Sequence, residues 1–187
     1  MLRAIARHAV RVILPFSFVA LGFAQTASAQ TTVALPDTSQ TTLLTATVSE
    51  QARVIVPASV AFSVTNISNN TAASASTVTI DRIVLATATK QLKVSVQAAA
   101  ANFTPPVVGA TTWAASDVSW NAAAWTHATG VSGVMSAATF TQIATCDPGV
   151  VDCSTTALTF TLAAKPTVAR SGAHTLVVTW KVESIGS

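Results

Sequence analysis

The chain has 187 residues; half of them are apolar and only 9% are charged. Three of its ten Lys and Arg residues, Arg3, Arg7 and Arg11, lie in an N-terminal segment that we expect to be removed, which leaves seven basic against seven acidic side chains. This balance gives no reason to expect nucleic acid or anionic lipid as a partner. Disorder is disfavoured as well, because low hydrophobicity and high net charge are both missing.

Residues 1–29 have the pattern of a cleaved signal peptide. The three arginines precede an apolar run over residues 12–24, and Ala27-Ser28-Ala29 forms a small-x-small cleavage site before Gln30. The run is too short to span a bilayer of about 30 Å, and no second run of about 20 apolar residues follows. We therefore expect export to the periplasm, the cell surface or the extracellular space, with no transmembrane span in the mature chain.

The mature chain is predicted to consist of a short arm and one domain. Residues 30–41 are Thr-rich, contain Pro36 and show no clear period, which favours a flexible N-terminal arm. The remaining residues, 42–187, have the length of a single domain with a sizeable core.

Strand patterns recur along that domain. They fall at residues 42–49, 53–56, 60–65, 77–86, 91–98, 118–121, 138–144, 157–163 and 174–183. Apolar and polar residues alternate without a break over 92–96 and 158–162, so these strands should have one buried and one exposed face. Over 78–85 the alternation shifts phase at Asp81-Arg82, which predicts a bulge or bend.

The strand pattern predicts an all-β fold. No long segment has a helical period, and segments rich in turn-forming residues separate the strands. The best architecture is an antiparallel, immunoglobulin-like β-sandwich of about eight or nine strands, with a closed barrel as the alternative.

Cys146 and Cys153 are the only cysteines and bracket a Pro148-Gly149 turn. In an oxidising compartment this pair is predicted to form a disulfide that closes a loop tip. So short a loop contributes only about 2 kcal/mol by the loop-closure argument, so the bridge should order one loop rather than hold the domain together. A thiolate metal site or a redox pair is disfavoured, because the two cysteines lack Cys-x-x-Cys spacing and no His lies near them in the sequence.

The aromatic residues divide into expected core and candidate surface groups. The expected core aromatics are Phe62, Trp120, Phe160 and Trp180, which lie on predicted strands. Trp113 and Trp125 lie in less regular sequence and form a candidate binding surface for a sugar or a partner protein. The lack of any Tyr weakens that second reading, since Tyr is abundant on recognition surfaces.

No motif indicates catalysis, a metal or a cofactor. His127 and His174, the only histidines after cleavage, belong to no metal-binding motif. Asp147 and Asp152 leave a weak Ca²⁺ site open, although a dedicated loop supplies more oxygen ligands. A dispersed Ser-His-Asp triad also stays open, since its members need not be adjacent. With no nucleophile elbow, P-loop or dinucleotide fingerprint, we expect a protein that is not an enzyme.

Two segments resemble small exported bacterial β-sandwich proteins. These are residues 52–62, ARVIVPASVAF, and residues 172–182, GAHTLVVTWKV. They are similar to spore-coat-U-like and pilin-like secreted domains, and the second also to the closing strand of WxL cell-surface domains. The resemblance implies an envelope or extracellular structural protein. Peptidoglycan binding is not carried over, because Val182 stands where the WxL pattern has Leu.

Two functions follow from these features. The first is a non-catalytic structural or assembly protein of the bacterial surface or matrix, in which residues 33–48 add to a neighbour's sheet edge. The second is an envelope- or glycan-binding adhesion module that uses surface tryptophans. Leu176, Val178 and Trp180 share one face of the last predicted strand, so the domain is expected to need no strand from a partner.

Overall fold

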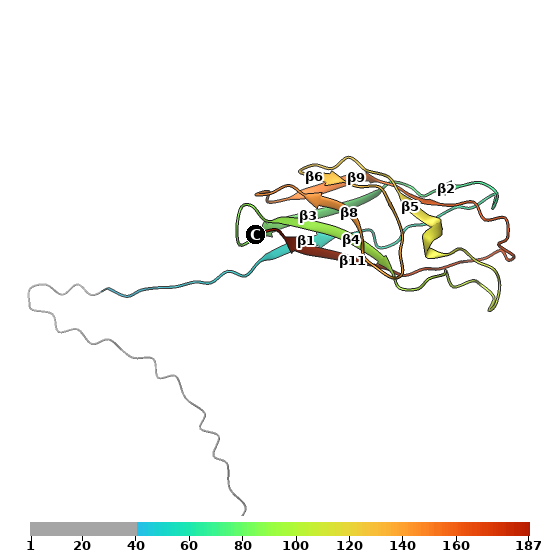
Figure 1. The fold of residues 1–187 in the computed structure, drawn as a ribbon, viewed down its shortest axis with the longest axis horizontal. Coiled ribbons are helices and arrows are strands. Elements are labelled where there is room, and N and C mark those ends of the chain that lie inside the picture. The colour runs from blue at the N-terminus through green and yellow to red at the C-terminus, as the bar shows by residue number, and fades with distance from the viewer. Residues whose placement is uncertain (1–40) are drawn as a thin grey trace, which may run out of the picture. The chain divides into compact units, whose positions relative to one another are not determined.

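The computed structural model describes residues 41–187 (Figure 1). The chain divides into two units, Met1–Thr45 and Ala46–Ser187, and the second contains every strand described below. The predicted signal peptide, and the predicted arm up to residue 40, lie outside the described residues.

The described part of the chain is all-β and consists of three antiparallel sheets (Figure 1). The first contains β1 (Gln51–Ile55), β3 (Ser76–Val84) and β9 (Cys153–Leu158), in that order. The second contains β2 (Thr71–Ala72), β10 (Phe160–Leu162), β5 (Val118–Trp120) and β7 (Gly133–Val134). The third contains β11 (Val178–Ile185), β4 (Gln91–Ala98), β8 (Thr141–Cys146) and β6 (Ala128–Gly130). A 3₁₀ turn, η1 (Ala115–Asp117), precedes β5.

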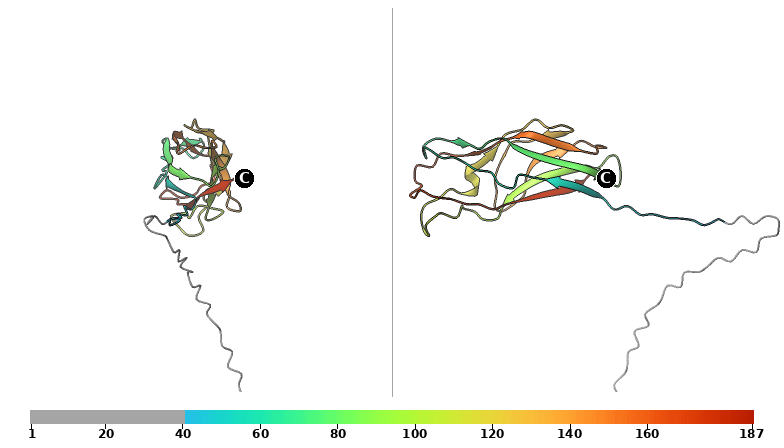
Figure 2. Two further views of the ribbon diagram at one scale, coloured as in Figure 1. Left: turned by 90° about the vertical axis from the view of Figure 1, so that its left-hand side faces the viewer. Right: turned by 180° about the vertical axis from the view of Figure 1, so that it is seen from behind.

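Each sheet ends in two edge strands, so the closed arrangement that the sequence left as an alternative is not formed. The edge strands β1 and β11 belong to different sheets but lie side by side, with the end of β1 near the start of β11 (Figures 1 and 2). No helix within residues 41–187 has the length and hydropathy to cross a membrane.

Long alternating segments formed strands where the sequence predicted them. β4 covers the predicted residues 91–98, and buried residues alternate along β10. The bulge predicted in β3 is confirmed: the register with β1 shifts between the pairs Gln51–Val84 and Arg53–Asp81. The extra residue is Arg82, whose φ of 53° lies in the left-handed region. The shift in the apolar–polar alternation at Asp81-Arg82 therefore correctly predicted an irregularity of the backbone.

Three predicted strands are corrected by the structure. Residues 42–49 and 60–65 form no strand, and the last strand starts at Val178 instead of residue 174. In each case the sequence has strand-like alternation, but a strand also needs a neighbour that supplies hydrogen bonds. The predicted count of eight or nine strands is exceeded in the described residues, because four strands were not foreseen as separate elements: β2, β6, β7 and β9.

The main core lies between the sheets and contains the expected aromatics. Trp120 and Phe160 are buried, and their rings meet edge to face with centroids 6.2 Å apart. Phe62 and Trp180 are half-buried and pack against this core from its margin. All four predicted core aromatics therefore contact the core, but two of them are not enclosed by it.

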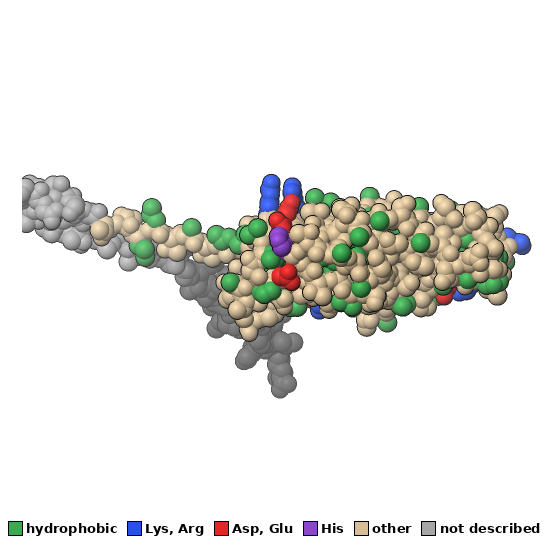
Figure 3. Space-filling model, turned by 90° about the horizontal axis from the view of Figure 1, so that it is seen from above, with side chains coloured by type: hydrophobic (Ala, Val, Ile, Leu, Met, Phe, Trp, Pro, Cys, Tyr) green, Lys and Arg blue, Asp and Glu red, His purple; other side chains and the backbone are tan. Residues whose placement is uncertain are grey.

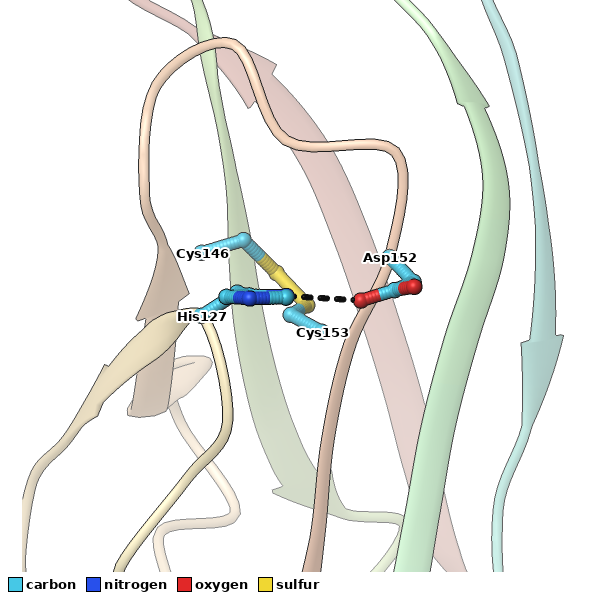
Figure 4. Close-up of a disulfide and its surroundings, with 4 residues drawn as sticks. All are labelled: His127, Cys146, Asp152 and Cys153. Carbon is cyan, nitrogen blue, oxygen red and sulfur yellow. Dashed lines mark hydrogen bonds and ion pairs between the residues drawn. A yellow bond between two sulfur atoms is a disulfide. The ribbon is translucent and has the colours of Figure 1, made fainter.

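A second, smaller core contains the disulfide. Cys146 ends β8, Cys153 begins β9, and the two are bonded as predicted (Figure 4). Both are buried, with exposed fractions of 1% and 0%, in a cluster with Ile80 and Val94. The bridge closes the loop between β8 and β9 as predicted, and its sulfur atoms are also part of the core packing.

Candidate functional site

An apolar groove lies between two segments of the chain, one that follows β1 and one that precedes β11. Residues 56–64 form one wall and residues 168–178 the other. The cavity between them has a volume of about 1010 Å³, which is at the upper end of the range for small-molecule sites. Because β1 and β11 are edge strands of separate sheets, no strand of the described chain fills this space.

The floor of the groove is the main hydrophobic core itself. Six buried core residues line it, namely Phe103, Trp113, Val118, Met135, Phe160 and Leu162. These residues have exposed fractions of 3% to 8%, so only small parts of their side chains face the groove. The groove is therefore an apolar opening above the core, not a polar cleft built for chemistry.

The first wall has the side-chain pattern of a strand without the hydrogen bonds of one. Val60, Phe62 and Val64 are half-buried against the core, whereas Ala61 and Ser63 between them are exposed. Residues 57–65 make no backbone hydrogen bond to any other residue of the described part. Backbone N–H and C=O groups are strong hydrogen-bonding groups, so this wall is able to accept a partner strand.

The second wall has one paired edge and one unpaired edge. Thr175 exchanges both backbone hydrogen bonds with Thr104, at N–O distances of 2.7 and 3.0 Å. Backbone groups of successive residues in an extended chain point to opposite edges, so those of Leu176 point away from Thr104. They have no backbone partner among residues 41–187. Both walls of the groove thus offer unused backbone groups.

The groove carries little charge. Arg170 and His174 are the only ionisable residues along its walls. His174 is held in place, because its Nδ1 lies 2.7 Å from Thr112 Oγ1 and its Nε2 lies 3.0 Å from the Arg170 carbonyl oxygen. Its ring also meets Trp113 edge to face, with centroids 5.2 Å apart. Both ring nitrogens are occupied, so His174 acts here as a wall residue.

Uncharged side chains dominate the surface as well. On the face drawn in Figure 3, charged and histidine side chains gather at one end of the domain and a few lie at the other. Most of the ionic groups are matched locally, as in the pairs Lys90–Glu50, Lys93–Glu183 and Lys165–Asp117. On this face, the middle of the domain offers no charged patch that would attract a highly charged ligand.

The two candidate surface tryptophans do not form an aromatic platform. Trp113 is only 5% exposed, and its Nε1 donates a hydrogen bond to the Ala163 carbonyl oxygen at 2.9 Å. Trp125 is half-buried against the main core, and its Nε1 is buried without a hydrogen-bond partner in the described part of the chain. The predicted exposure of Trp113 is therefore wrong: the irregular sequence around it forms a loop that packs its ring inward.

His127 and Asp152 lie together beside the disulfide. His127 Nδ1 is 2.8 Å from Asp152 Oδ1 (Figure 4). This hydrogen bond, followed by attraction to Asp152 and Asp147, raises the pKa of His127 above its ordinary value of 6.5. No group of three metal-ligating side chains gathers anywhere in residues 41–187. The structure thus joins the histidine and the aspartate that the sequence analysis treated separately.

The groove itself was missed in the sequence analysis, although the signal for it was present. The segments 42–49 and 60–65 both alternate like strands, and the structure leaves both without a partner. No family model matches this sequence, and no curated protein or solved structure is significantly similar to it. The function is therefore argued from the geometry of the groove.

Proposed function

We propose that this chain is an exported, non-catalytic structural or assembly protein of the bacterial cell surface or extracellular matrix. The observation that carries the proposal is the apolar groove, whose floor is the main core and whose two walls have unused backbone hydrogen-bonding groups. An opening of this kind is suited to receiving an extended chain, because backbone hydrogen bonds supply affinity and alternate side chains fill the core.

Several further features support this role. The low charge leaves little electrostatic repulsion between copies. The buried disulfide is suited to an oxidising compartment outside the cytoplasm. We also infer that the sheets form an immunoglobulin-like sandwich whose missing cover lies between β1 and β11. Glycan binding through surface tryptophans is less well supported, because Trp113 is buried.

Self-association of the chain from Gln30 onward tests this function. Light scattering across a concentration series should reveal species that grow with concentration. Val64→Asp should reduce this growth, because Val64 lines the groove and a carboxylate there opposes apolar contact. Its matched control is Thr65→Asp, which changes an exposed neighbour outside the groove and should assemble like the wild type.

The fold of each variant is checked by the near-UV circular dichroism of its tryptophans. Should Val64→Asp not fold, Val64→Thr makes the same comparison, since it keeps the side-chain shape and replaces one methyl group by a hydroxyl. A wild-type protein that stays monomeric at every concentration would contradict an assembly role.

A further inference from the structure

We propose that the groove is filled by residues 42–49 of a second copy of this chain, which enter as an extended strand between residues 57–64 and the segment leading into β11. This inference rests on the proposed assembly function and names its partner and contact. Four observations carry it. They are the exposed apolar side chains of the segment, its two-residue period, the unpaired backbone groups of the groove walls, and the matching lengths of segment and groove.

The segment is exposed and apolar. Leu43, Leu44 and Val48 have exposed fractions of 90%, 89% and 70%, and residues 41–49 contain no charged side chain. A soluble protein seldom leaves several large apolar side chains so close together in water without a surface that covers them. A groove with an apolar floor accepts such a segment without burying an unpaired charge.

The period of the segment matches that of the groove. In an extended conformation Leu44, Ala46 and Val48 share one face, whereas Leu43, Thr45 and Thr47 point the other way. The first wall of the groove has the same two-residue repeat, with every second side chain turned to the core. We therefore assign the face of Leu44 to the core and that of Thr45 to solvent.

The backbone groups and the lengths also match. The segment forms no strand, and residues 57–65 and Leu176 lack backbone partners within the described chain. Eight extended residues span about 26 Å, for residues 42–49 as for residues 57–64. The two predicted strands that the structure leaves unpaired thus have the composition and the reach to pair with each other.

A second copy fits better than the chain's own segment. Residue 50 leads directly into β1, whose five residues cover about 17 Å before the groove begins at Val56. If the chain reversed at Glu50 and ran back along β1, residues 45–49 would lie beside β1 and not in the groove. Leu44, Ala46 and Val48 reach the groove together only when they come from another molecule.

Such a contact uses two different surfaces of each molecule. The segment of one copy enters the groove of the next, which leaves one segment and one groove free at the ends of the assembly. Contacts of this type continue into open chains unless the geometry closes a ring. We expect a series of growing species instead of a single symmetric dimer.

Paired substitutions in the segment test the proposal without disturbing the domain. In Leu44→Asp/Val48→Asp the face assigned to the core gains two carboxylates, which should weaken self-association about a hundredfold or more. The control Thr45→Asp/Thr47→Asp adds the same charge to the opposite face and should stay within about threefold of the wild type. Sedimentation velocity measures the association constants.

A mixing experiment identifies the groove as the receiving site. Leu44→Asp/Val48→Asp keeps an intact groove, and Val64→Asp keeps an intact segment. Each should assemble poorly alone, but a mixture should form one-to-one heterodimers that grow no further, because the segment of the second variant enters the groove of the first. No such heterodimer forms if the contact lies elsewhere.

The outcomes separate this inference from the proposed function. If the wild type does not associate, the assembly function fails. If the wild type associates but both double variants match it, assembly stands and residues 42–49 are not the occupant. If the wild type is monomeric and Leu44→Asp/Val48→Asp alone exposes the segment to protease, the segment fills its own groove, and the second-copy contact is overturned.

Discussion

At the scale of single residues, the packing of Trp120 depends on a glycine opposite it. A Cβ atom added at Gly133 would lie 2.5 Å from Cζ2 of the Trp120 ring, far closer than the normal contact of about 3.5 to 4 Å between carbon atoms. The indole cannot retreat easily, because it is buried and its Nε1 donates a hydrogen bond to the Val131 carbonyl oxygen at 2.9 Å. Position 133 therefore requires a residue without a side chain.

Gly133→Ala should lower the free energy of unfolding by about 1 to 3 kcal/mol, the usual effect of overpacking a core. Urea denaturation measures this loss. In a Trp120→Phe background the smaller ring removes the clash, so the same substitution should have a smaller effect there. An equal loss in both backgrounds would show that the ring is not what excludes a side chain at Gly133.

The His127–Asp152 pair predicts a pH-dependent contribution to stability. Because its hydrogen bond raises the pKa of His127 in the folded state, the contribution is fully present below pH 6.5 and is lost as pH rises through the folded-state pKa. Asp152→Asn should return the pKa of His127 toward 6.5, as measured by NMR titration of its ring protons.

Asp147→Asn is the matched control in the same loop. Asp147 acts on His127 only by charge attraction, which raises the pKa of His127 less than the contacts with Asp152 do, so this change should shift the titration less. A larger shift in Asp147→Asn than in Asp152→Asn would contradict the contact seen in Figure 4.

At the scale of elements, the disulfide joins β8 to β9 and fills part of the second core. Loss of the bond in Cys146→Ala/Cys153→Ala should lower the free energy of unfolding by about 2 to 4 kcal/mol. Chemical reduction of the wild type keeps both sulfur atoms in the core and should cost less than the double substitution. If both treatments have the same effect, packing of the sulfur atoms adds nothing to the bond.

An alternating sequence forms a strand only where neighbouring strands are present, as a comparison of β4 with residues 60–65 shows. β4 lies between two neighbours in its sheet, so its alternating sequence is matched by hydrogen bonds on both edges. Residues 60–65 have a similar alternation but no neighbour, and they form no strand. Side-chain period predicts which way a segment faces, whereas strand formation needs a partner at the right distance.

At the scale of the whole molecule, the domain has an apolar groove above its main core that no strand within residues 41–187 fills. Its apolar groove and its exposed apolar segment are complementary in period, length and lack of charge. Binding of one to the other would stabilise the folded state by mass action, so assembly and stability are expected to rise together with concentration.

Sequence alone determined the all-β class, the cysteine pairing, the bulge at Arg82 and the core positions of Trp120 and Phe160, because these depend on local period and spacing. Only the tertiary structure decided that Trp113 is buried, that Asp152 meets His127, and that a groove lies open beside β1 and β11. Those outcomes depend on which distant segments become neighbours. Periodicity marked residues 42–49 and 60–65 as strand-like, but it does not show which segments find a partner.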